Sequence, residues 1–207
     1  MRKAANHLKK ADSVMRTIIE RIGPCRMEFG LPQFHSLAEA IVYQQLNGRA
    51  AFTIFKRLAA LAGEPLTPAG ILKLSDEQMR SVGLSKQKSG YLKDMAQKAA
   101  AGTLDFARLP ELTDAEIIEH LTQVRGVGVW TAQMFLIFSL KRENVLPTGD
   151  FGVRMAMYKH YLDRNGVRLR ARGNEQLEQR KLRPARSSFR LQSKWEKSPR
   201  GGSHTEA

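Results

Sequence analysis

Residues 121–132 read Leu-Thr-Gln-Val-Arg-Gly-Val-Gly-Val-Trp-Thr-Ala, and residues 146–151 read Leu-Pro-Thr-Gly-Asp-Phe. An apolar run of helical type separates the two segments, and a further helical pattern that begins at Asp114 precedes them. Gly126 and Gly128 flank one apolar residue between these patterns. Glycine reaches left-handed dihedrals and lets another backbone come close. The stretch therefore predicts a tight hairpin between two helices.

The predicted hairpin has the chemistry of an anion site. Its second helix begins at about Gly128, where the first amide N–H groups lack partners within the helix and the helix dipole adds positive potential. A phosphate is the favoured ligand, and contacts to a sugar-phosphate backbone position a nucleic acid without reading its sequence. Glycine pairs are also common in ordinary turns between helices, so that alternative stays open.

Asp150 follows Pro147, Thr148 and Gly149 and opens another helical pattern. Aspartate is among the best residues for the N-cap of a helix, because its carboxylate accepts from the first free amides. The same position suits a carboxylate displayed for chemistry. The two roles are compatible, and the spacing alone does not choose between them.

Three blocks of sequence carry a resemblance to a known family. The first is the hairpin followed by Pro-Thr-Gly-Asp-Phe-Gly-Val-Arg at 147–154, the second is Ala-Ile-Val-Tyr-Gln-Gln-Leu-Asn-Gly-Arg-Ala-Ala at 40–51, and the third spans 74–88. Taken in their order along the chain, 40–51, then 74–88, then the hairpin segment, they resemble the helix-hairpin-helix (HhH-GPD) DNA glycosylases, specifically the 3-methyladenine DNA glycosylase II branch. The resemblance covers residues 10–162 and implies an all-α helical bundle around the helix-hairpin-helix motif.

The resemblance also implies a catalytic site. Asp150 is expected to stabilise oxocarbenium character on the deoxyribose, or to orient or deprotonate the attacking water. Trp130 is expected to form an aromatic wall for a cationic alkylated base, with Met134 one turn along in the same pocket. A core tryptophan and a packing methionine are the alternatives for these two residues, and both stay open.

The segment around Gln45 is expected to enter DNA. In the family, the corresponding residues enter the minor groove, fill the space of the extruded nucleotide and line the base pocket. Gln45 is therefore the predicted plug, and Tyr43 and Gln44 are predicted near the pocket. Paired amides at a helix end are otherwise usually solvated, so that alternative also remains.

The family resemblance further implies contacts at the hairpin. The backbone positions expected to contact DNA phosphate are Arg125, Gly126, Val127, Gly128 and Thr131. The main-chain carbonyls that match a site for a monovalent cation, Na⁺ or K⁺, are those of Thr122, Val124 and Val127.

No cofactor is expected to be required. Bifunctional relatives place a nucleophilic lysine at the position of Trp130, so simple hydrolysis without strand cleavage is expected. Cys25 is the single cysteine, which excludes a four-cysteine iron–sulfur cluster within one chain.

Composition divides the chain into two parts. Of the formal charge of +14 over 207 residues, +8 falls in residues 164–207, a polar and basic segment that buries little apolar surface and is expected to be largely disordered. Residues 1–163 carry almost no strand pattern and are expected to form one helical domain. The single cysteine favours a reducing compartment, and no run reaches the ~20 apolar residues of a membrane span, so an intracellular protein is expected.

Four local predictions complete the analysis. Ser36 with Glu39 three residues on predicts a helix N-cap, and Gly23-Pro24 predicts the end of a helix that starts near residue 10. Cys25 is expected as a small apolar filler. The lysines expected to be solvated rather than bound to phosphate are Lys86, Lys88 and Lys93.

The predicted function is a monofunctional DNA glycosylase for alkylated purines of the 3-methyladenine type in base excision repair. Its expected partner is double-stranded DNA with alkylated bases, and a monomer without membrane contact is expected. A non-catalytic DNA-binding protein is the second hypothesis, because the sequence departs from the family beyond residue 162 and the base pocket would then lack a wall. A helix-turn-helix regulator is third, since Gly-Val-Gly is the wrong turn for a base-reading helix.

Overall fold

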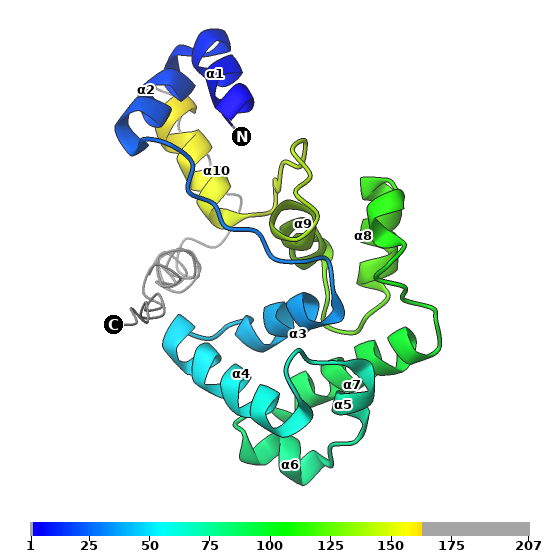
Figure 1. The fold of residues 1–207 in the computed structure, drawn as a ribbon. Coiled ribbons are helices and arrows are strands. Elements are labelled where there is room, and N and C mark those ends of the chain that lie inside the picture. The colour runs from blue at the N-terminus through cyan, green and yellow to red at the C-terminus, as the bar shows by residue number, and fades with distance from the viewer. Residues whose placement is uncertain (1, 163–207) are drawn as a thin grey trace, which may run out of the picture.

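The computed structural model describes residues 2–162, and their regular structure is entirely helical (Figure 1). No strand occurs in this range, so the predicted all-α class is confirmed. The predicted tail at 164–207 lies outside the described residues. The elements are α1 (Arg2–Ala11), α2 (Ser13–Ile22), α3 (Phe34–Tyr43), α4 (Gly48–Ala62), α5 (Pro68–Leu72), α6 (Asp76–Ser81), α7 (Lys86–Ala100), the 3₁₀ turn η1 (Leu109–Glu111), α8 (Asp114–Thr122), α9 (Val129–Phe138), α10 (Phe151–Met157) and the π-helical turn η2 (Tyr158–Leu162).

Helix α3 is the centre of the packing. Figure 1 shows it with α9 on one side and α4 on the other, and it also packs on α7. Its residues Leu37, Ala38, Ile41 and Val42 are fully buried, at the spacing that places apolar residues on one face of a helix. The core continues from these residues through α4, α5, α7 and α8 to Leu136 of α9. The hairpin between α8 and α9 is thus anchored in the main core.

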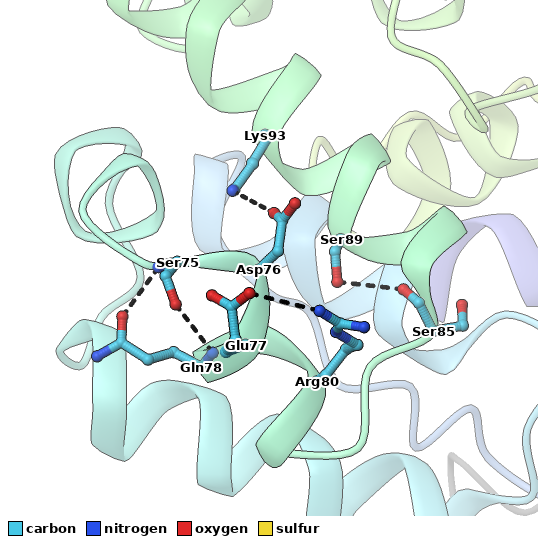
Figure 2. A network of polar contacts seen from close by, with 8 residues as sticks. All are labelled: Ser75, Asp76, Glu77, Gln78, Arg80, Ser85, Ser89 and Lys93. Atoms are coloured by element: carbon cyan, nitrogen blue, oxygen red, sulfur yellow. Dashed lines mark hydrogen bonds and ion pairs between the residues drawn. The ribbon is translucent and has the colours of Figure 1, made fainter.

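Polar side chains fix the starts of α6 and α7 (Figure 2). Ser75 and Gln78 form a capping box at α6, in which each side chain accepts from the other residue's amide, and Ser85 caps α7. Lys93 of α7 forms an ion pair with Asp76 of α6. The prediction that Lys93 is merely solvated is therefore wrong. Each cap is worth about 1 kcal/mol to the helix it starts.

Helices α1, α2 and α10 lie together beside the core helices (Figure 1). None of their residues is buried, nor is any residue of η2. Asp12 caps α2 by accepting from the Met15 amide at 2.7 Å, and it also accepts a hydrogen bond from Tyr161 of η2. This layer is therefore held by partial apolar contact and by polar links between its helices.

Three of the local predictions can be compared with the structure. Helix α2 ends at Ile22, and Gly23 follows with φ +86, as predicted. The Ser36 cap is wrong: α3 begins at Phe34, and the Ser36 hydroxyl donates to the Leu31 carbonyl at 2.7 Å. Cys25 is exposed, so it is not an apolar filler. Within residues 2–162, no helix combines the length and the apolar character that crossing a membrane requires.

Candidate active site

Trp130 and Asp150 form the centre of the candidate site. The Trp130 indole Nε1, in the first turn of α9, donates to Asp150 Oδ2 at 2.8 Å. Asp150 is the N-cap of α10, and its Oδ1 accepts from the Val153 amide at 2.8 Å. The predicted cap is therefore confirmed, and it uses only one carboxylate oxygen. Because the two donors come from different helices, they fix the orientation of the carboxylate.

Trp130 is a surface tryptophan, so the alternative that placed it in the core is wrong. Its exposed fraction is 42%, and its chain neighbour Val129 and the Asp150 neighbour Phe151 are exposed by 54% and 53%. Large apolar side chains exposed next to polar groups mark binding surfaces. Met134, one turn along α9, is half-buried. An exposed indole face beside a carboxylate suits a cationic aromatic ligand.

The hairpin joins α8 to α9 through residues 123–128. Gly126 has φ +81, and a Cβ at this position would lie 2.1 Å from Tyr91 Cδ2, so both the backbone and the packing require glycine. Gly128 has φ −94, outside the left-handed region, and is the N-cap of α9 without any side-chain cap. The first amides of α9 are therefore left for solvent or for an anion.

Asp94 of α7 binds the hairpin at Arg125. Its Oδ2 accepts from the Arg125 amide at 2.9 Å, and its Oδ1 lies 3.1 Å from Arg125 Nε and 2.7 Å from Lys98 Nζ. Burial raises the pKa of the Asp94 carboxyl, but the bonds from Lys98 and Arg125 together outweigh burial and hold the pKa below its usual value. The prediction that the Arg125 backbone contacts phosphate is wrong, because the Arg125 amide donates to Asp94 instead.

Gln44 and Gln45 follow α3 and have different surroundings. Gln44 Nε2 donates to the Gly126 carbonyl at 2.9 Å and reaches Thr131 Oγ1 at 3.4 Å. Gln44 thus joins the end of α3 to the hairpin, and the solvated alternative is wrong for it. Gln45 is exposed and has φ +56, which is unusual for a residue with a side chain.

Tyr43, the last residue of α3, is half-buried. Its ring meets Phe55 edge-on, with centroids 6.3 Å apart. Burial, and after it the nearby Glu39 charge, raise the pKa of Tyr43 to about 12. The phenol is neutral at physiological pH even at its ordinary pKa, and the raised pKa extends that range to higher pH.

Lys88 of α7 also reaches the end of α3. Its Nζ donates to the Val42 carbonyl at 2.7 Å and to the Gln44 carbonyl at 2.6 Å. Burial lowers the pKa of this lysine. The prediction of a solvated side chain is wrong for Lys88, because the two carbonyls replace water around its ammonium group.

A family match covers most of the residues that build this site. The model of the family described as "HhH-GPD superfamily base excision DNA repair protein" matches residues 38–179, which include the hairpin, Trp130 and Asp150. The chain belongs to the HhH-GPD superfamily. The resemblance to this family drawn from the three sequence blocks is confirmed.

Several proteins named as DNA-3-methyladenine glycosylases are similar to this chain. DNA-3-methyladenine glycosylase 1 of Schizosaccharomyces pombe is 34% identical over 158 residues, which cover 73% of this chain and 69% of the relative. A putative DNA-3-methyladenine glycosylase of Bacillus subtilis is 32% identical over 135 residues, which cover 62% of this chain but only 47% of the relative.

Solved structures of 3-methyladenine DNA glycosylases have a similar fold. The S. pombe 3-methyladenine DNA glycosylase in complex with abasic DNA has a TM-score of 0.67 at 35% identity, over 78% of this chain and 81% of that one. The DNA-3-methyladenine glycosidase of Bacillus halodurans has a TM-score of 0.68 at 34% identity, over 75% and 72% of the two chains.

The sequence analysis assigned no role at the site to three residues of α7: Lys88, which it predicted only as solvated, Tyr91 and Asp94. Their spacing of three residues along α7 was the available signal, since it puts two charges and a phenol on one stripe beside the apolar residues Leu92 and Met95. The partners of Lys88 and Asp94 in the loop after α3 and in the hairpin lie 31 or more residues away in the chain. The spacing along α7 therefore does not identify what these residues contact.

Metal sites of the common protein type do not occur in residues 2–162, where no group of three or more His, Cys, Asp or Glu side chains is placed to hold an ion. A monovalent cation at main-chain oxygens would not need such a group. The Val124 carbonyl already accepts from the Val127 amide at 3.0 Å in the hairpin turn. The cation site at Thr122, Val124 and Val127 stays a prediction.

Proposed function

We propose that this chain is a DNA glycosylase that hydrolyses the N-glycosidic bond of flipped-out alkylated purines of the 3-methyladenine type and leaves an abasic site for base excision repair. The observation that carries the proposal is the hydrogen bond between Trp130, in the first turn of the hairpin's second helix, and Asp150, the N-cap of α10. The substrate class is supported by the names of the relatives. The S. pombe relative was solved with abasic DNA, the kind of product that such a reaction leaves.

The chemistry follows from the charges that develop as the bond breaks. The deoxyribose gains oxocarbenium character, so a carboxylate near C1′ stabilises the transition state more than the ground state. Asp150 supplies that carboxylate and can also orient the water that adds to C1′ or take its proton. An alkylated purine carries positive charge, which makes it a good leaving group and attracts it to the face of Trp130. Because the indole N–H of Trp130 holds Asp150, the base wall and the carboxylate are set relative to each other.

The proposed reaction is hydrolysis alone. A lyase step needs an amine that attacks C1′ and forms a Schiff base. In this chain the residue paired with Asp150 is Trp130, which has no such amine. The abasic strand is therefore expected to remain unbroken.

The same proposal assigns DNA contacts to the loops beside the site. The first amides of α9 bind a phosphate, and a monovalent cation at the hairpin carbonyls can support that contact. Gln45 fills the gap left by the flipped nucleotide, which offsets part of the roughly few kcal/mol that unstacking costs. The protein is proposed to act as a monomer on double-stranded DNA.

The test is release of free methylated base from alkylated duplex DNA by the wild type and by Asp150→Asn. Asparagine is also a good N-cap, so the start of α10 is expected to form in this variant. Wild type should release base, and Asp150→Asn should do so at least roughly 100-fold more slowly. Asp114→Asn is the control, because it also removes a carboxylate at the start of a helix, here in the first turn of α8, together with its ion pair to Arg142, and should leave the rate unchanged.

Two further outcomes separate the alternatives. If neither wild type nor Asp150→Asn releases base although both bind abasic duplex, the chain is a non-catalytic DNA-binding protein. If the product strand breaks without alkali or heat, the hydrolytic mechanism is wrong.

A further inference from the structure

Helix α7 contacts both of the elements that the proposed function assigns to DNA. Lys88, Tyr91 and Asp94 are spaced by three residues and lie along one face of the helix. Lys88 binds the end of α3, the Tyr91 ring lies against Gly126, and Asp94 binds Arg125. Neighbouring residues on α7 such as Leu92 are fully buried, so the core holds this part of the helix in place.

The residue just beyond the Lys88 contact has an unfavourable backbone. Gln45 has φ +56 and is exposed, although it is not glycine. Left-handed dihedrals of this kind persist where surrounding contacts fix them, and they gather at functional sites. The two carbonyls that Lys88 holds belong to Val42 and Gln44, three residues and one residue before Gln45 in the chain. The ammonium group of Lys88 therefore fixes the backbone that leads into this conformation.

The contacts form a closed circuit between the loop and the hairpin. Lys88 holds the Gln44 carbonyl, and the Gln44 side chain donates to the Gly126 carbonyl at 2.9 Å. Gly126 in turn lies against Tyr91, one helical turn from Lys88 on α7. A loop tied at both its backbone and its side chain has little freedom to shift relative to the hairpin.

We propose that Lys88 is a positioning residue that fixes the distance between the backbone at Gln45 and the hairpin. At this distance, Gln45 can fill the gap in a DNA duplex while the hairpin amides bind a phosphate of the same duplex. This inference rests on the proposed roles of Gln45 and of the hairpin. Lys88 acts through Gln44 and Gln45 and does not itself touch the reacting atoms.

The test compares Lys88→Met with Lys93→Met in the full chain. Both variants remove an ammonium group from α7 and break a polar contact, but Lys93 pairs with Asp76 on α6, away from the hairpin (Figure 2). Lys88→Arg retains donors for the two carbonyls and serves as the conservative variant. The probe is a duplex with a tetrahydrofuran abasic-site analogue and 2-aminopurine beside it, whose fluorescence rises when the plug unstacks it.

The expected result is specific to Lys88. Lys88→Met removes both hydrogen bonds and should lower the fluorescence plateau at saturating protein. It should also reduce the affinity ratio of abasic over undamaged duplex by roughly tenfold, the size of the contribution of a single hydrogen bond to a charged group. Lys93→Met should keep the wild-type plateau and ratio, and Lys88→Arg should restore most of both. If Lys88→Met does not fold, Gln44→Met breaks the same circuit at the Gly126 carbonyl and should show the same two losses.

The outcomes separate this inference from the proposed function. Equal plateaus and ratios for Lys88→Met and Lys93→Met overturn the positioning role, even where the wild type releases base. A wild type that shows the plug signal but releases no base overturns the enzymatic proposal and leaves the role of Lys88 in place. A wild type that shows neither signal nor selectivity overturns both.

Discussion

Asp150 receives one hydrogen bond from the helix that it caps and one from a tryptophan on another helix. The cap alone would leave Oδ2 free to turn, because a single bond does not fix the plane of a carboxylate. The Trp130 N–H removes that freedom and brings an aromatic face to the same place. The Trp130 side chain therefore has two functions, as the donor to Asp150 and as an aromatic surface, and substitution can separate them.

Trp130→Phe keeps an aromatic wall and removes the donor to Asp150. We expect the single-turnover rate of base release to fall roughly tenfold, because the carboxylate loses one hydrogen bond. Affinity for abasic duplex should stay near that of the wild type. Trp130→Ala should lose rate further, because the wall is gone as well. A wild-type rate for Trp130→Phe would show that the hydrogen bond does not contribute to catalysis.

The two hairpin glycines give a second pair of matched residues. Gly126→Ala places a Cβ against Tyr91 and strains a backbone at φ +81, and we expect it to lower the free energy of unfolding by about 1–3 kcal/mol. At Gly128 a Cβ meets nothing within 4 Å and φ is −94. Gly128→Ala should therefore change stability little. Urea unfolding of both variants measures the contrast, and equal losses would contradict it.

At the scale of the element, α7 supports the hairpin through a carboxylate that is 8% exposed. The pKa of Asp94 is held below its usual value of 3.8 in the folded chain. As the pH falls, the unfolded chain therefore takes up this proton first. The stabilisation from Asp94 is present above the unfolded pKa and is lost as the pH falls toward the folded pKa.

Asp94→Asn should remove this dependence. We expect a lower melting temperature at neutral pH and a flatter melting profile between roughly pH 5 and pH 3 than in the wild type. Glu119→Gln, which neutralises an exposed acid on α8, should keep the wild-type slope. Parallel profiles for wild type and Asp94→Asn would show that this carboxylate does not stabilise the folded chain.

Elements whose signals are local were predictable from the sequence. The turn at Gly126, the cap at Asp150 and the end of α2 at Gly23 each depend on residues within a few positions. The pairing of Trp130 with Asp150 and the links from α7 to the hairpin depend on contacts 20 or more residues apart. Ser36 shows the limit of local reasoning, because its hydroxyl finds the Leu31 carbonyl rather than a helix amide.

At the scale of the whole molecule, the candidate site spans parts of unequal burial. Trp130 stands on α9, which contributes Ala132, Phe135 and Leu136 to the core, whereas Asp150 opens α10, which has no buried residue. Local opening is easiest where few apolar groups are buried. Trp130 therefore lies on a helix that is anchored in the core, and Asp150 lies on a helix with little buried support.

Hydrogen exchange should reveal this difference. We expect amides of α3 and α7 to be the most protected, and those of α1, α2 and α10 to exchange much faster. Abasic duplex DNA should slow exchange in α10 and in the hairpin while leaving α6 unchanged. Equal protection of α10 and α7 in the free protein would contradict the expectation.

The bond between Trp130 and Asp150 also gives the protein an optical signal of its own. The chain has two tryptophans, Trp130 and Trp195. In a Trp195→Phe variant, the emission of Trp130 would come from the indole that binds the carboxylate and that a cationic base would cover. Detachment of α10 would shift the emission wavelength, and a stacked base would quench it. Attachment of α10 to α9 and binding of a base would thus give two different changes in the fluorescence of Trp130, and both can be measured without an added label.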